Sequence, residues 1–156
     1  MNLVVGAGNI LLSDEGIGIH LVQDLERENI FEDTSYADIG TSSLDISSYI
    51  DDRTEKLVLI DCIRTESFPP GTVFRLSVDD LRKRQARNFS LHQIELVDSI
   101  KLNSLDSGIP PTIVIGIAPA DIGTFSMELS DALKAKYPDI LSKVKKIISD
   151  FLFKDA

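Results

Sequence analysis

The residues LVVGAGNILLSDEGIG, numbers 3–18, set the architecture of the chain. A short apolar run predicts a buried strand, and a Gly-Ala-Gly turn follows it. A helical pattern comes next, in which Ile17, Leu21 and Leu25 recur every four residues. Strand, glycine turn and helix in this order are typical of the first unit of a parallel α/β fold. Two adjacent acids, Asp14 and Glu15, lie between the turn and the helix, where a phosphate-binding loop would avoid negative charge.

Further strands and helices alternate along the chain. The sequence predicts strands at residues 3–6, 34–40, 56–62 and 112–118, and an edge strand or hairpin arm at 71–78 after a Pro-Pro-Gly turn. Helices are predicted at 17–25, at 90–100 after a Ser90 cap, and at the C-terminus with Pro138 in the first turn. The expected fold is a three-layer α/β/α sandwich with a mostly parallel, twisted sheet and one antiparallel edge strand. At 156 residues, one domain spanning 1–156 is the simplest division.

Charge and composition narrow the function. A formal net charge of −9 without a basic run argues against a nucleic-acid partner. A single cysteine, Cys62, allows neither an internal disulfide nor a thiolate zinc site. No apolar run approaches the ~20 residues of a membrane-spanning helix, and no signal-peptide pattern opens the chain. We therefore expect no membrane insertion and a cytoplasmic location.

Acids follow the carboxyl ends of three predicted strands, the edge at which open α/β sheets bind ligands. The candidate residues there are Asn9, Asp14 and Glu15, then Asp38, Gly40 and Thr41, and finally Asp61. One acid can simply complement a helix N-terminus. Acids at three strand ends favour a metal site instead, because neighbouring carboxylates repel one another unless a cation intervenes.

The sequence supports nucleotide binding and nucleophilic catalysis less well. A G-x-G-x-x-G nucleotide fingerprint would need glycine where Leu11 stands. We expect His20 to pack on the apolar side of the first helix. His92 lies just after the Ser90 cap, where a helix N-terminus favours the neutral imidazole that binds metals, although a surface histidine is equally compatible. Cys62 should point away from its neighbour Asp61, and no nucleophilic triad is apparent.

Five segments, in chain order, resemble the nickel–iron hydrogenase maturation endopeptidases. The opening VVGAGNILLSDEGIG resembles their G-x-G-N-x-L-x-x-D-[DE]-G-x-G motif. The other four are DIGTSSLDI (38–46), LVLIDCIRTESFPPGTVF (57–74), SLHQIELVD (90–98) and VIGIAPADIGTFSMELSDAL (114–133), similar to the family's D-x-G-T, strand-Asp, histidine-bearing and G-I-x-P-x-D-I segments. The chain departs from the common pattern at Ala120, where many members carry an acid.

The resemblance implies a metal-dependent, aspartic-type endopeptidase that removes a C-terminal peptide from a hydrogenase large-subunit precursor after nickel insertion. It places nickel contacts on Glu15, Asp61 and His92, and it makes Asp38 a candidate for the reaction itself. Two carboxylates and one imidazole suit nickel but leave coordination positions open, as expected for an ion that arrives with the nickel-loaded precursor. Zinc or cadmium should substitute for it in crystals.

Two other functions remain open at this stage. One is a different peptidase on a related fold, of the germination-protease type, which a nickel requirement would separate from the maturation endopeptidases. The other is a nucleotide- or metal-binding α/β module, which thermal shift with each ligand would reveal.

Overall fold

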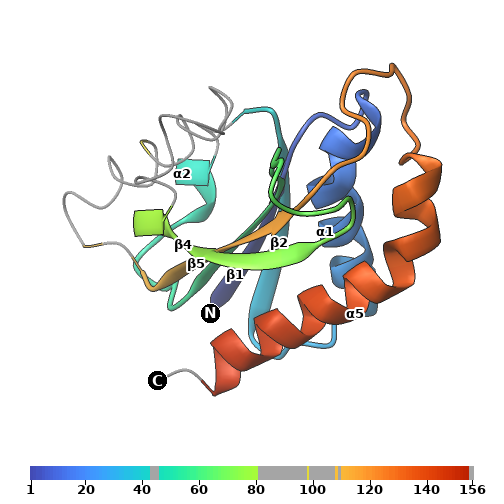
Figure 1. Ribbon diagram of the computed structural model, residues 1–156. Coiled ribbons are helices and arrows are strands. Elements are labelled where there is room, and N and C mark those ends of the chain that lie inside the picture. Colours follow the sequence, from blue (N-terminus) through green and yellow to red (C-terminus); the bar gives the residue numbers. More distant parts are fainter. Residues whose placement is uncertain (43–45, 81–97, 99–107, 109, 155–156) are drawn as a thin grey trace.

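A five-stranded, mostly parallel sheet forms the centre of the fold (Figure 1). The computed structural model describes residues 1–42, 46–80, 98, 108 and 110–154, and the strand order is β2-β1-β3-β5-β4. The strands are β1 (Asn2–Ala7), β2 (Thr34–Gly40), β3 (Leu57–Cys62), β4 (Val73–Ser77) and β5 (Thr112–Ile117). The other elements are the 3-10 turn η1 (Ser13–Gly16) and the helices α1 (Ile17–Glu28), α2 (Ile46–Tyr49) and α5 (Asp131–Phe153). Among the described strands, β4 alone runs antiparallel, against β5 at the edge, so the predicted sheet is confirmed.

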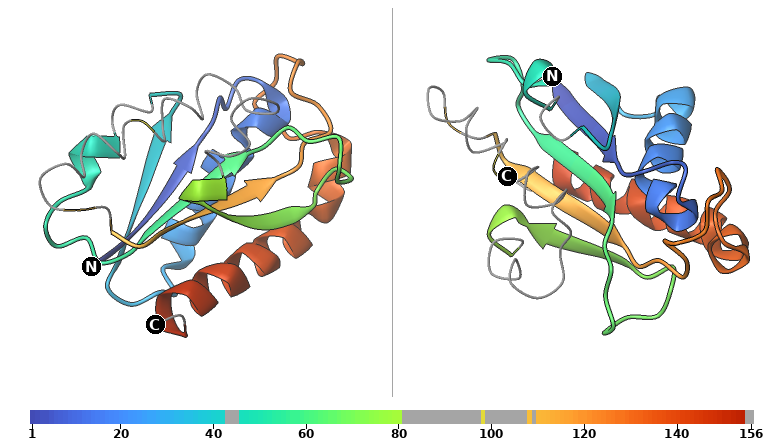
Figure 2. Two further views of the ribbon diagram at one scale, coloured as in Figure 1. Left: turned by 60° about the vertical axis from the view of Figure 1, so that its left-hand side comes forward. Right: turned by 90° about the horizontal axis from the view of Figure 1, so that it is seen from above.

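Helices cover both faces of this sheet, with α1 and α5 on one face and α2 on the other (Figure 2). The alternation of side chains along β3 divides the core in the same way. Val58 and Ile60 pack with α1 and α5, whereas Leu57 and Leu59 pack with Ile46 of α2. All five side chains are fully buried. The predicted three-layer α/β/α arrangement is confirmed.

Two glycines bring the start of α1 into contact with the sheet. A Cβ at Gly18 would lie 2.4 Å from the Ala7 carbonyl oxygen and 2.5 Å from the Ile60 carbonyl oxygen. A Cβ at Gly6 would lie 2.3 Å from the Gly18 carbonyl oxygen. Because only glycine fits at both positions, the helix begins directly against β1 and β3, and residues 8–16 form the connection at the carboxyl edge of the sheet.

The C-terminal helix begins earlier than the sequence predicted. Ser130 is its N-cap and accepts a hydrogen bond from Leu133 N at 3.3 Å, so Pro138 lies inside α5 and not in its first turn. The cap and the buried stripe that includes Ile140 and Val144 hold the helix together across the proline. In the part of the chain that the structure describes, no helix combines the length and apolar character needed to cross a membrane.

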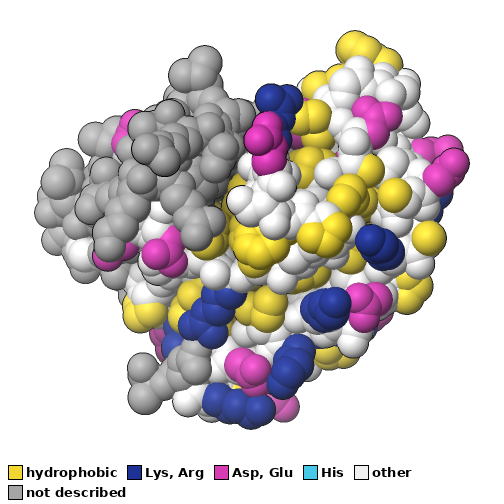
Figure 3. Space-filling model, in the orientation of Figure 1, with side chains coloured by type: hydrophobic (Ala, Val, Ile, Leu, Met, Phe, Trp, Pro, Cys, Tyr) yellow, Lys and Arg dark blue, Asp and Glu magenta, His cyan; other side chains and the backbone are white. Residues whose placement is uncertain are grey.

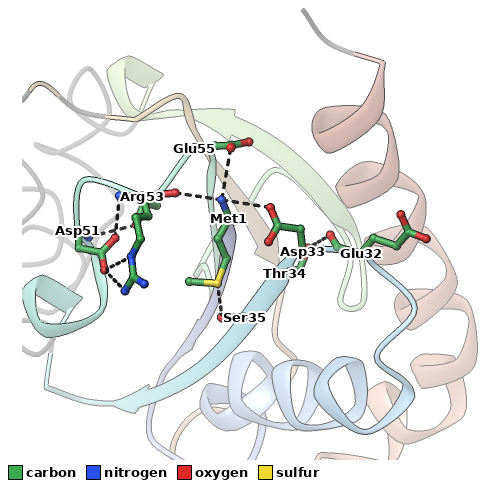
Figure 4. Close-up of polar contacts among 9 residues, drawn as sticks. Met1, Glu32, Asp33, Thr34, Ser35, Asp51, Arg53 and Glu55 are labelled. Atoms are coloured by element: carbon green, nitrogen blue, oxygen red, sulfur yellow. Dashed lines mark hydrogen bonds and ion pairs between the residues drawn. The ribbon is translucent and has the colours of Figure 1, made fainter.

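Polar contacts connect loops at the opposite edge of the sheet, where the parallel strands begin (Figure 4). The Met1 amine lies 3.3 Å from Asp33 Oδ2 and 3.5 Å from Glu55 Oε1, and it donates to the Arg53 carbonyl at 3.0 Å. These exposed ion pairs contribute at most about 1 kcal/mol each to stability. They lie at the far end of the strands from the predicted site.

Candidate active site

The carboxyl ends of β1 and β3 meet at Gly8, whose φ is +140°. A Cβ at this position would lie 2.1 Å from the Glu15 carbonyl oxygen and 3.8 Å from Asp61 Oδ1. The fold therefore brings Glu15 and Asp61, which are far apart in the sequence, next to one glycine. Any side chain at Gly8 would collide with the backbone of η1.

Asp61 is 3% exposed at the end of β3, and its neighbour Cys62 points into the α1–α5 side of the core, as the alternation predicted. Burial raises the pKa of the Cys62 thiol, and the charges of Asp61, Glu15 and Asp14 raise it further. Because Coulomb effects weaken with distance, each of these three carboxylates lies near the thiol. The thiol stays protonated at neutral pH, so Cys62 is not a nucleophile there.

Asp14 is fully buried, and its carboxylate accepts four hydrogen bonds from one loop. Oδ2 accepts from Ala120 N at 2.9 Å, from Asp121 N at 2.8 Å and from Ser130 Oγ at 2.8 Å. Oδ1 accepts from Ser130 N at 2.7 Å. Asp14 therefore fastens both ends of loop 120–130 to the candidate site. These partners do not follow from local sequence patterns, because they lie more than a hundred residues from Asp14 along the chain.

Asp38 lies exposed at the carboxyl end of β2. Its Oδ1 accepts a hydrogen bond from Gly40 N at 2.9 Å, and the Gly40 carbonyl accepts one from Gly8 N at 2.9 Å. These bonds connect the end of β2 to the glycine beside Glu15 and Asp61. Thr41 follows in an exposed turn, and Asn9 Oδ1 accepts a backbone hydrogen bond within its own loop at 3.0 Å.

The third predicted nickel contact, His92, lies outside the described residues. Among the residues that are described, no three or more His, Cys, Asp or Glu side chains are arranged to hold a metal ion. Of the predicted contacts, the structure brings the backbone of Glu15 and the carboxylate of Asp61 to Gly8. A divalent ion bound there needs further ligands, from elsewhere in the chain or from a partner.

A pocket of about 390 Å³ lies between α1, α5 and the loop that Asp14 fastens. Its walls include His20, Met127, Leu129 and Tyr137. His20 is half-buried and not part of the core, and its buried Nε2 has no hydrogen-bond partner within the described part of the chain. No sequence pattern indicated this pocket, because its walls come from residues 20–27 and residues 127–137, two regions far apart in the chain.

Comparison with known proteins identifies the family of this chain. The hydrogenase maturation protease family model matches residues 19–147. The hydrogenase 2 maturation protease of Escherichia coli is 30% identical over 122 residues, covering 77% of this chain and 74% of the relative.

Two solved structures share the fold over almost their whole length. The hydrogenase maturating endopeptidase HybD of E. coli superposes with a TM-score of 0.79 at 25% identity, covering 97% of this chain and 93% of that one. HybD of Thermococcus kodakarensis, a [NiFe] hydrogenase maturation protease, gives a TM-score of 0.76 at 26% identity, covering 94% and 97%. The chain belongs to the hydrogenase maturation protease family and is a hydrogenase maturation endopeptidase.

Proposed function

We propose that this endopeptidase removes the C-terminal extension of a nickel–iron hydrogenase large-subunit precursor, and that Glu15, Asp61 and His92 contact nickel carried by that precursor. The observation that carries the proposal is the position of Gly8, which lies against the Glu15 backbone carbonyl and near Asp61 Oδ1, on the edge where open α/β sheets bind their ligands. A divalent ion delivered by the substrate would favour the ionised form of the buried Asp61 carboxylate.

Nickel acts here as part of the substrate. Two carboxylates and one imidazole form an incomplete ligand set, whereas a permanent catalytic metal is usually held by three firm protein ligands and a supporting shell. An incomplete set binds free ion weakly and binds well only when the precursor contributes the remaining ligands. A precursor without nickel is then left uncut.

Two ways of promoting attack of water on the scissile carbonyl fit the site. In the first, the Asp38 carboxylate acts as the base that accepts a proton from water. In the second, nickel polarises the scissile carbonyl and Asp38 only stabilises the end of β2. Asp38→Asn separates them, because the amide keeps an oxygen that accepts the Gly40 hydrogen bond but no longer acts as a base. A loss of kcat greater than roughly 100-fold assigns the base to Asp38, and retained kcat assigns activation to the metal.

The direct test incubates the purified chain with its purified large-subunit precursor, with and without nickel, and determines the product mass. We expect cleavage of the nickel-loaded precursor only. Asp61→Asn and Glu15→Gln should each reduce that cleavage more than roughly tenfold while the circular dichroism spectrum stays unchanged. Asp52→Asn, at an exposed loop position, is the matched control. Wild-type rates for both site variants, or equal cleavage without nickel, would remove the assignment.

A further inference from the structure

Three exposed apolar side chains form a patch beside the candidate active site. Leu11 is 47% exposed, Phe125 83% and Met127 61%. Ser126, between the last two, donates its N–H to the Leu11 carbonyl at 2.9 Å, and the two segments form a parallel bridge. Figure 3 shows hydrophobic side chains at the upper right, over the loop that follows β5. Large apolar groups gathered on a surface in this way are typical of contact sites.

The backbone beneath the patch is held in place. The Asp14 carboxylate binds the loop at both ends, and Asp121 Oδ1 accepts from Gly123 N at 2.9 Å and Thr124 N at 3.0 Å within it. Phe125 is therefore presented to solvent by a fixed turn. A preformed surface binds a partner without the entropic cost of ordering the loop.

The pocket between α1 and α5 continues from the patch, because Met127 belongs to both. Its charged side chains are paired with one another. Arg27 Nη1 lies 2.8 Å from Asp24 Oδ1, and Lys134 Nζ lies 3.1 Å from Glu128 Oε2. With both cations matched by carboxylates, the pocket offers no excess charge to a phosphate or a free carboxylate. A pocket that combines Met127 and Leu129 with paired charges is suited to an uncharged anchor side chain of a protein partner.

We propose that the patch and the pocket together form the docking surface for the body of the precursor, with an apolar side chain of the precursor seated in the pocket. The inference rests on the proposed function, since its occupant is the same precursor. Continuity with the site identifies this occupant, because Leu11 lies in the same loop as Glu15. A protein that brings its metal to Glu15 and Asp61 therefore comes close to the patch.

The test measures the Kd of purified, nickel-loaded large-subunit precursor for protease variants by surface plasmon resonance, together with KM and kcat of cleavage. The variant Phe125→Ser/Met127→Ser removes two of the three patch side chains, and Gln23→Trp places a bulky ring in the pocket from an exposed position of its wall. We expect each to raise Kd and KM about tenfold or more, which equals about 1.4 kcal/mol, and to leave kcat within about twofold.

Ile30→Ser/Phe153→Ser is the matched control, since these side chains are 54% and 59% exposed and lie away from the pocket wall. It should leave Kd within about twofold of wild type.

The outcomes separate the two proposals. If the wild type cleaves the precursor while both variants bind it as the control does, the docking surface is wrong and the proposed function stands. If the wild type neither binds nor cleaves it, both are wrong. If the patch variant abolishes self-association in sedimentation and leaves Kd unchanged, the patch joins copies of this chain, which also overturns the docking proposal.

Discussion

Replacing Asp14 by asparagine removes one charge from a buried position while keeping the shape of the side chain. The carboxylate accepts four hydrogen bonds, three from backbone N–H groups and one from the Ser130 hydroxyl. An amide has one oxygen, so its best placement puts that oxygen at the Oδ2 position, where it meets three donors. Its NH2 group then faces Ser130 N, and two donors oppose each other.

The size of the effect follows from this arrangement. The lost bond from Ser130 N to a charged acceptor is worth about 1.5–3 kcal/mol, and the remaining three weaken as their acceptor becomes neutral. We expect the free energy of unfolding to fall by about 2–4 kcal/mol. Since a domain of this kind has roughly 5–15 kcal/mol of stability, the variant should stay folded and measurable.

Urea denaturation followed by far-ultraviolet circular dichroism suits this chain, which contains no tryptophan. The midpoint should fall by roughly 1–2 M at an unchanged m value. Amide exchange at Ala120, Asp121 and Ser130 should accelerate in the variant. Asp139→Asn removes the same charge from an exposed ion pair and should cost less than about 0.5 kcal/mol. If Asp14→Asn costs no more than this control, and the three amides keep their protection, Asp14 does not fasten the loop.

Three further outcomes follow from single positions. Gly8→Ala should push η1 away and reduce precursor cleavage more than roughly tenfold, whereas Gly123→Ala, with open space around it, should not. Above pH 9.0, the ordinary pKa of a cysteine thiol, the unfolded chain loses the Cys62 proton while the native chain keeps it. The free energy of unfolding should then fall by about 1.4 kcal/mol per pH unit through this group, and a denaturation series in Cys62→Ala should lack that component. Pro138→Ala should restore a helical N–H, increase the free energy of unfolding by about 1–3 kcal/mol and raise the unfolding midpoint. An unchanged midpoint would show that the proline does not destabilise α5.

The central strands β1, β3 and β5 were predictable because each is defined by local apolar composition. Predicted residues 34–40 coincide with β2, and predicted residues 56–62 differ from β3 by one residue. The start of α5 was not predictable in the same way. Pro138 favours a helix start wherever no other cap competes, but Ser130 provides a cap further upstream, and the helix continues through the proline because its apolar stripe is buried on the sheet.

The sequence predicts which edge of the sheet carries the candidate site but not which of its acids serve structural roles. Strand ends in a parallel sheet share one edge, so the rule that places ligands there assigns Asp38 and Asp61 to the same edge. The pocket beside α1 depends on which residues of loop 120–130 reach His20, and this follows from contacts between segments about a hundred residues apart. Local patterns carry no information about such contacts.

The two adjacent acids of the opening motif show what only the fold decides. Asp14 is fully buried, and its carboxylate accepts hydrogen bonds from four donors. Glu15 is half-buried, and its backbone lies against Gly8, which is also near Asp61. From the sequence alone, either acid could hold loop 120–130 or contact a metal ion. Because both sit in the four-residue turn η1, any shift of Asp14 also moves Glu15. The residue that holds the exposed apolar loop, Asp14, is thus the chain neighbour of Glu15, the residue proposed to contact nickel.

We therefore expect Asp14→Asn to weaken precursor binding and nickel-dependent cleavage together, whereas Phe125→Ser should weaken binding alone. Cleavage assays on the two variants at saturating precursor test this difference, and equal kcat in both would show that the loop and the site are not coupled through η1.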